Sequence, residues 1–183
     1  MYLHTIKQSF IAMIFFTILL GVIYPFLIMG IGYTFTPEQT EGSIIKYQGK
    51  PVGSSLIGQV SPTGFFQPRP SANNYDALES GGSNLAINNP KQLALISNRI
   101  QILQNTYGGQ KVPADLVFAS GSGLDPDISL QAALYQANHI SAVQKLPYQT
   151  VIDLIMENRK IHWFNPPTIN VLELNIALKP YTS

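Results

Sequence analysis

One long uncharged segment near the amino terminus constrains what this chain can fold into more than any other feature. Every residue from Phe10 to Ile31 is uncharged, and most are large and apolar. A helix rises about 1.5 Å per residue, so this segment is long enough to cross the roughly 30 Å hydrocarbon core of a bilayer. We predict a membrane-spanning helix over residues 10–32. We expect a kink near Tyr24 and Pro25, because a membrane helix tolerates proline where a soluble helix would break.

A cleaved signal peptide is the main alternative for this segment. Its apolar region is only about 7 to 15 residues long and is followed by a small-x-small cleavage site. Gly30-Ile31-Gly32 is the nearest match, and it lies at the end of a stretch that is already long enough to span. We therefore predict an uncleaved anchor. Within it, Thr17 and Gly21 form a small-xxx-small pair on which another helix could pack closely.

The charges on either side of the segment predict its orientation. Lys7 is the only charged side chain before residue 38, whereas Glu38 and Glu41 follow the segment. Positive charge is retained on the cytoplasmic side of a membrane. We therefore expect residues 1–9 to form a short cytoplasmic tail and residues 38–183 to lie outside the cytoplasm.

Charge and cysteine content exclude several classes of function. Charged residues make up 11% of the chain, with 11 basic and 10 acidic side chains, against roughly 25% charged residues in soluble domains. This balance argues against nucleic acid, which is held by clustered basic residues. The absence of cysteine excludes disulfides, thiol nucleophiles and cysteine metal sites. No phosphate loop and no P-type phosphorylation motif occurs, so we expect the chain alone neither to hydrolyse ATP nor to hold a structural metal.

The residues after the membrane segment predict one mixed α/β domain. Ser43–Tyr47 and Val52–Val60 are expected to be the strands of a hairpin, joined by a turn that contains glycine. Asn89 followed by proline starts a helix that should end before Gly108, and a shorter helix is expected at Pro147–Asn158. Strands interleaved with helices are typical of a single compact domain.

Three further elements follow from weaker patterns. An apolar run predicts a strand over Val112–Ala119, and Asp125-Pro126-Asp127 resembles the start of a helix. Between Leu172 and Leu178, apolar side chains alternate with other residues, which predicts a half-buried strand.

Two glycine–serine clusters, around Ser83 and Ser122, raise a serine hydrolase as an alternative function. Asp125 and His139 would be the candidate triad partners. A nucleophile elbow needs glycine two residues before and two residues after the serine, and neither serine has both. Because the elbow pattern is incomplete, a membrane-anchored envelope hydrolase is kept only as the second hypothesis.

A calcium loop is a further alternative at the same place. Asp125, Asp127 and Ser129 match its first three ligand positions, but Leu130 and Gln136 occupy the sixth and twelfth. Helix capping explains the two acids better, so we predict no metal site.

The order of five short segments resembles the C subunit of the bacterial Kdp potassium-transporting ATPase. The segments are GSSLIGQ at Gly53–Gln59, RPSA at Arg69–Ala72, SGGSNL at Ser80–Leu85, ASGSGLDP at Ala119–Pro126 and NVLELN at Asn170–Asn175. With one leading membrane helix, the resemblance covers nearly the whole chain. Asp127, where many members carry histidine, and the segment around His139, which lacks an arginine, depart from the family. The motif residues expected to be structural are Gly81, Gly82, Ser83, Asn84, Ser122, Gly123 and Asp125.

The resemblance implies a single-pass subunit of the bacterial inner membrane, with its domain in the periplasm. Its implied partners are a channel-like subunit that moves potassium, a P-type subunit that hydrolyses ATP and a small single-span subunit. ATP and potassium are used by the complex, and no cofactor is implied for this chain alone, which is not an enzyme by itself. The family's C subunit is linked to assembly with the channel-like subunit and to raised nucleotide affinity of the catalytic subunit. We favour assembly, because the domain is expected outside whereas ATP is cytoplasmic, so a nucleotide effect would be indirect.

Within the proline-rich loop Ser61–Tyr75, residues Phe65–Ala72 carry the predicted contact with the channel-like subunit. They include Phe65, Phe66, Arg69 and Ser71. Aromatic residues and arginine are enriched at interface centres, and proline lowers the cost of ordering a loop. On this hypothesis an alanine at position 69 weakens assembly but leaves the melting temperature nearly unchanged. The competing hypothesis pairs that arginine with an acid of its own domain, in which case the melting temperature falls.

Overall fold

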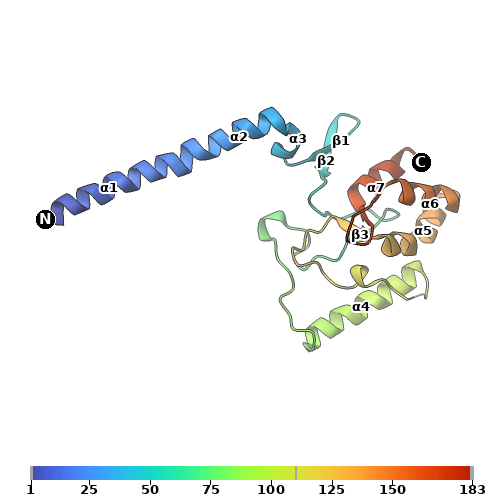
Figure 1. The fold of residues 1–183 in the computed structure, drawn as a ribbon. Helices are drawn as coiled ribbons and strands as arrows, with labels where there is room; N and C mark the ends of the chain where they lie inside the picture. The colour runs from blue at the N-terminus through green and yellow to red at the C-terminus, as the bar shows by residue number, and fades with distance from the viewer. Residues whose placement is uncertain (1, 110, 182–183) are drawn as a thin grey trace. The chain divides into compact units, whose positions relative to one another are not determined.

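The computed structural model describes residues 2–109 and 111–181, and the chain divides into two compact units, Met1–Ile44 and Ile45–Ser183 (Figure 1). The first unit is dominated by a continuous helix from Tyr2 to Phe35. Its parts are α1 (Tyr2–Ile18), a π-helical turn (Leu19–Ile23) and α2 (Tyr24–Phe35), followed by the short α3 (Pro37–Thr40). The helix therefore extends beyond both ends of the predicted span at 10–32.

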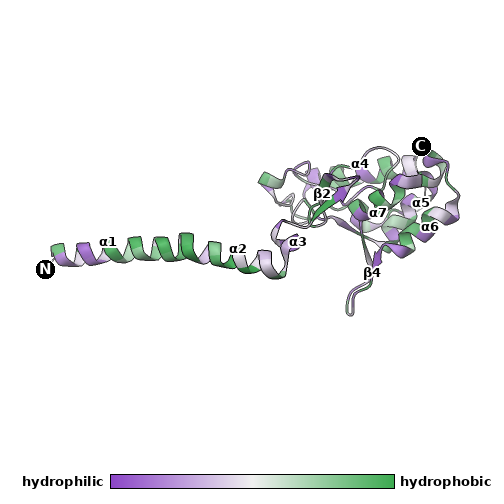
Figure 2. Cartoon of the chain, turned by 90° about the horizontal axis from the view of Figure 1, so that it is seen from above, coloured by the Kyte–Doolittle hydropathy of each residue, from purple (hydrophilic) through white to green (hydrophobic). Residues whose placement is uncertain are grey.

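No residue of α1 or α2 is buried within the unit, although the segment is strongly hydrophobic (Figure 2). An apolar helix without a protein surface to cover it finds a matching solvent in hydrocarbon. By length and composition, this helix fits a single membrane span. The limits of that span stay a prediction.

The π-helical turn ends directly before Tyr24 and Pro25, near which we expect a kink. The Tyr24 amide donates to the Leu19 carbonyl, five residues back. Proline lacks an N–H donor, so one carbonyl in the preceding turn is left without its usual helical partner. A π-helical turn pairs each amide with the carbonyl five residues back, and so changes which carbonyl is left unpaired. The same turn includes Gly21 and follows Thr17, whose hydroxyl donates to the Met13 carbonyl at 2.8 Å. Packing of another helix against Thr17 and Gly21 stays a prediction.

The second unit is a mixed α/β domain with two small sheets, which confirms the predicted fold class. β1 (Ile44–Tyr47) and β2 (Lys50–Ser54) pair with each other, and β3 (Asp127–Ser129), β5 (Thr168–Asn170) and β4 (Arg159–Lys160) form an antiparallel sheet in that order. The longer helices are α4 (Pro90–Tyr107), α5 (Leu130–Gln144), α6 (Tyr148–Glu157) and α7 (Val171–Leu178).

Several of these elements were predicted correctly from capping and turn residues in the sequence. The Asn89 side chain accepts from the Lys91 amide at the start of α4, which ends before Gly108. The hairpin and α6 are also confirmed, although β2 is shorter than predicted. Its turn is Gln48-Gly49, and both residues have positive φ angles, 51° and 77°, as a two-residue hairpin turn of type I′ requires.

Two predicted elements are wrong, and a third begins later than predicted. Val112–Ala119 is a loop with one 3-10 turn at Ala114–Leu116, which begins after a proline. The helix predicted to start at Asp125-Pro126-Asp127 is present as α5, but it begins at Leu130, because the Ser129 side chain caps it by accepting from the Ala132 amide. The expected strand at Leu172–Leu178 is the helix α7.

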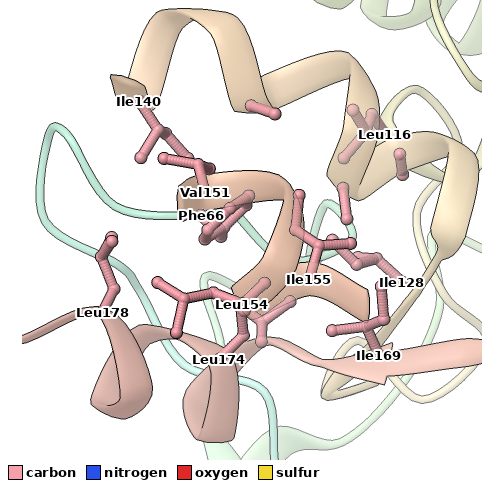
Figure 3. Close-up of a cluster of buried hydrophobic side chains, with 14 residues drawn as sticks. Phe66, Leu116, Ile128, Ile140, Val151, Leu154, Ile155, Ile169, Leu174 and Leu178 are labelled. Carbon is pink, nitrogen blue, oxygen red and sulfur yellow. The ribbon is translucent and has the colours of Figure 1, made fainter. Parts of the chain in front are cut away.

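The hydrophobic core lies where α5, α6 and α7 meet the three-stranded sheet (Figure 3). Ile128 of β3 and Ile169 of β5 are register partners, and both are fully or almost fully buried. Phe66, from the proline-rich loop, lies among the helix side chains with no exposed surface. The loop that was predicted to be an interface is therefore part of the core at this residue.

Candidate functional site

Three of the motif segments meet in one place, which we call the loop junction and define as residues 69–76, 79–84 and 120–125. The Gly81 amide donates to the Ser122 carbonyl at 2.8 Å, and the Ser120 amide donates to the Pro70 carbonyl at 3.2 Å. The Ser80 hydroxyl donates to the same Ser122 carbonyl at 3.0 Å. Segments about forty and fifty residues apart are thus joined through backbone groups, which need partners when they leave water.

The first segment of the loop junction is organised by Ser71 and Asn73. The Ser71 hydroxyl accepts from the Asn73 and Tyr75 amides at 3.2 and 2.9 Å. The Asn73 side chain donates to the carbonyls of Asp76 and Glu79. Tyr75 has a positive φ of 61°, and its hydroxyl donates to the Arg69 carbonyl at 2.8 Å. These side chains therefore hold an irregular backbone in one conformation.

Two glycines allow the segments to approach closely. Gly123 has a φ of +69°, and a Cβ atom there would lie 2.6 Å from Asn73 Oδ1 and 2.7 Å from the Gly81 carbonyl oxygen. At Gly58 a Cβ atom would lie 2.6 Å from the Asp125 carbonyl oxygen, and the Gly58 amide donates to the Leu124 carbonyl at 2.7 Å. The GSSLIGQ segment therefore packs against the far end of ASGSGLDP.

The remaining motif residues have different surroundings. A Cβ atom at Gly82 would lie 3.2 Å from the Gly121 carbonyl oxygen, and Asn84 has a positive φ of 51°. The Ser122 hydroxyl accepts from the Leu124 amide, as in a tight turn. Nothing in the described part of the chain explains why Ser83 occurs in its motif.

Arg69 pairs with Asp125 across the loop junction. Its Nη1 atom lies 2.9 Å from Asp125 Oδ2, and the two side chains are 28% and 30% exposed. Asp125 Oδ1 accepts from the Asp127 amide at 3.0 Å, so this acid closes a turn instead of starting a helix. The structure therefore supports the competing hypothesis for Arg69, which predicts a lower melting temperature for an alanine at position 69.

We expect Arg69→Ala to lower the free energy of unfolding of the full chain by about 1 kcal/mol, because a partly buried ion pair and its alkyl packing are lost. Asp125→Asn should cost a similar amount. In a double-mutant cycle, the coupling energy should be about 0.5 to 1 kcal/mol and should fall with added salt. Denaturant unfolding in detergent micelles measures all three variants. Strictly additive losses would show that the ion pair contributes nothing.

Two buried amide side chains, which the sequence analysis missed, fix the loop before Arg69. Asn175 Oδ1 accepts from the Phe66 amide at 2.8 Å, and Asn175 Nδ2 donates to the Phe66 carbonyl at 2.9 Å. Gln136 holds Gln67 in the same two-sided way, at 2.7 and 3.2 Å. Gln136 lies among apolar residues on α5. A single polar residue on an otherwise apolar helix face is the sequence signal that could have indicated a buried hydrogen-bonding role. The NVLELN motif thus positions the proline-rich loop through its last residue.

An apolar groove lies beside this loop and is a candidate contact for a partner. Its volume is about 290 Å³. β2, the segment after it, the proline-rich loop and α7 all contribute to it. The apolar lining comes from Val52, Ile57, Val60, Pro62, Phe65, Pro68, Pro126, Val171, Leu172 and Ile176. Val60 is 69% exposed, so the groove continues onto an open apolar surface, which is typical of interaction sites.

Neither alternative chemical site is assembled. The His139 ring packs edge-on against the Tyr107 ring, with centroids 5.0 Å apart, and in the described part of the chain no hydrogen bond or ion pair joins it to Ser83, Ser122 or Asp125. Within residues 2–109 and 111–181, no group of three or more histidine and acidic side chains is placed to hold a metal ion. Of the two acids in the calcium-like pattern, the Asp125 carboxylate is occupied by the turn and the ion pair described above.

The Asp127 carboxyl group lies in a partly buried environment. Its Oδ1 atom is buried without a hydrogen-bond partner among the described residues. Burial raises the pKa of Asp127, while Lys160 acts in the opposite direction and Asp125 adds to the increase. Lys160 itself pairs with Glu173 at 3.0 Å. The acid therefore favours its neutral form more strongly in the folded chain than in the unfolded chain.

This raised pKa predicts how stability depends on pH. The folded state holds the Asp127 proton more tightly, so the stabilisation is complete below the unfolded pKa near about 4 and is lost as pH rises through the folded pKa. We expect the free energy of unfolding of Asp127→Asn to match that of the wild type at low pH. At pH values above the folded pKa of Asp127, the variant should be the more stable protein. Urea unfolding from pH 3 to 7 measures the difference. A difference that is the same at every pH would contradict the burial argument.

The fold and the site define a class: a small α/β domain, rich in structural loop motifs, attached to one helix that fits a membrane span. The family model described as "K+-transporting ATPase, c chain" (KdpC) matches residues 6–180. The "Potassium-transporting ATPase KdpC subunit" of Caldanaerobacter subterraneus subsp. tengcongensis is 43% identical over 180 residues, covering 94% of this chain and 93% of that protein. The proteins of the same name from Methylococcus capsulatus and Yersinia pestis are 43% and 39% identical, over 94% and 97% of this chain and 95% and 93% of their own lengths.

This chain therefore belongs to the KdpC family of potassium-transporting ATPase subunits. The resemblance stated from five short motifs is confirmed. The serine hydrolase alternative is not favoured.

Proposed function

We propose that this chain is a membrane-anchored accessory subunit that supports assembly of an ATP-driven potassium import complex with its channel-like subunit. The observation that carries the proposal is the family match over residues 6–180. The described residues add support: motif side chains are used to hold loops together, and an open apolar groove lies beside them. On this proposal the chain is not catalytic by itself, and the P-type and small single-span subunits are its other partners.

The proposed location is the bacterial inner membrane, with residues 1–9 in the cytoplasm and residues 38–183 in the periplasm. Lys7 before the helix and Glu38 and Glu41 after it support this orientation. Any effect on the nucleotide affinity of the catalytic subunit would then pass through the membrane-embedded subunits.

A fusion after Ser183 tests the orientation. A reporter enzyme that is active only in the periplasm should be active there, and a reporter that is active only in the cytoplasm should not. The opposite pair of results would reject the external domain and make direct nucleotide contact the better explanation.

The groove supplies the test of assembly, and it replaces Arg69 and Phe66 as the proposed contact. Val60→Glu places a charge on its exposed apolar rim, so we expect at least about tenfold weaker copurification with the channel-like subunit. Ile102→Glu is the matched control, because Ile102 is 54% exposed on α4 and does not line the groove. Both variants should unfold like the wild type. Equal assembly of the two variants would exclude the groove as the contact.

A further inference from the structure

The loop between β4 and β5, which we call the aromatic loop and define as Ile161–Pro167, exposes large apolar side chains. Trp163 and Phe164 are each 95% exposed, and Ile161 is 74% exposed. β4 and β5 pair in register at Lys160 and Thr168. The chain therefore leaves the sheet and returns to it at the same edge, and Figure 2 shows the loop projecting beyond the rest of the domain.

The base of the aromatic loop is held in place. His162 Nε2 lies 2.9 Å from Thr168 Oγ1 across the loop, and Lys160 is tied to Glu173 of α7. Pro166 and Pro167 restrict the returning strand to extended conformations. A constrained loop that presents three neighbouring apolar side chains to water is a binding surface, since folding alone would bury them.

We propose that the aromatic loop inserts Trp163 and Phe164 into the interface of the bilayer that holds the amino-terminal helix. The indole ring prefers the boundary between headgroups and acyl chains, where its apolar body is covered and its N–H stays hydrated. Phenylalanine beside it adds apolar area without a polar group to desolvate.

Charge around the loop suits a lipid surface. No acidic residue occurs between Asn158 and Thr168, whereas Arg159 and Lys160 both lie there, Lys160 being paired with Glu173 of α7. Basic residues beside an inserted aromatic pair attract anionic headgroups. A bilayer that contains anionic lipid is therefore the occupant that both the apolar tip and the basic base of the loop fit.

The covalent link to the anchor lowers the entropy that the domain loses when the aromatic loop contacts the membrane. Only residues 36–44 separate the end of α2 from the second unit. At no more than about 3.6 Å per residue, Ile45 cannot be farther than roughly 35 Å from the end of the helix. The domain is therefore kept at a high effective concentration beside the membrane, so a weak insertion suffices.

The chain contains a single tryptophan, so fluorescence reports on Trp163 alone. The full chain is reconstituted in vesicles of phosphatidylcholine and phosphatidylglycerol, with ordinary or with brominated acyl chains. We expect brominated lipid to quench Trp163 and the emission to lie at shorter wavelength than in the urea-unfolded chain. Phe164→Asp should reduce the quenching. A Trp163→Phe/Ile102→Trp variant, whose indole is on α4, should be quenched less than the wild type.

The inference rests on the anchor of the proposed function, and flotation of the vesicles separates the two. The chain could float with the vesicles while Trp163 is quenched by aqueous iodide and not by brominated lipid. That result would overturn the insertion and leave the anchor standing. Shielding of Trp163 only after the other subunits are added would overturn it too and would assign the loop to a subunit contact. A chain that does not float rejects both the anchor and the insertion.

Discussion

Replacing Phe66 with alanine is expected to destabilise the α/β domain by about 3 to 5 kcal/mol, because a large side chain with no exposed surface is removed from the core. The cost should lie toward the upper part of this range. Asn175 holds both the amide and the carbonyl of Phe66, and Gln136 holds the next residue. A backbone that is fixed on both sides cannot collapse into the cavity, so the lost contacts are not regained.

Denaturant unfolding of the full chain in detergent micelles, followed by circular dichroism, measures this loss. The midpoint should fall without a change in slope, because the surface exposed on unfolding is nearly the same. Phe65→Ala is the matched control: the neighbouring ring is only partly buried against the core and lines the groove. It should cost clearly less. If Phe66→Ala unfolds like the wild type but assembles poorly, the ring is available to a partner and the interface hypothesis for Phe66 is restored.

Elements with strong end signals were predictable from the sequence. Asn89-Pro90 and Gly108 limit α4, and proline starts α6. The sequence of α7 carries both a capping residue, Asn170, and an alternation of apolar residues that predicts a strand. The Asn170 side chain accepts from the Glu173 amide, and the buried residues Val171, Leu174, Asn175 and Leu178 follow helical spacing. Most residues of this segment are apolar, so both the two-residue period of a strand and the 3.6-residue period of a helix fit it. The capping residue is therefore the signal that distinguishes the helix from the strand.

The short strands were not predictable. β3, β4 and β5 have three, two and three residues, which is too few for any periodicity. They exist because tertiary pairing brings them together, as Ile128 and Ile169 show in the core. Local pattern carries no information on such pairs.

The candidate site was predictable only in part, and through the resemblance. Gly81, Ser122 and Gly123 do meet in the loop junction, as structural residues should. The ion pair joins positions 56 residues apart, and nothing in the sequence selects Asp125 over the other acids as the partner of Arg69. The aromatic loop was not identified either, since the exposure of Trp163 depends on the hairpin that carries it.

Gly123→Ala is expected to lower the free energy of unfolding by at least about 2 kcal/mol, through two separate effects. A φ of +69° costs a residue with a side chain roughly 1 to 2 kcal/mol. The added Cβ atom would also meet the Asn73 side chain and the Gly81 carbonyl at 2.6 and 2.7 Å, and the carbonyl belongs to backbone that can move only if its hydrogen bond to Ser122 is disturbed.

Gly121→Ala is the matched control in the same segment, because Gly121 has no positive φ and no atom within 4 Å of the Cβ position. It should be nearly neutral or slightly stabilising, since alanine reduces the freedom of the unfolded chain. Thermal and urea unfolding of both variants measures the contrast. The strain should also open the junction between residues 79–84 and 120–125, so amide hydrogen exchange at Gly81 and Ser120 should increase in Gly123→Ala alone. Equal stability of the two alanine variants would mean that these segments do not pack as closely as the structure places them.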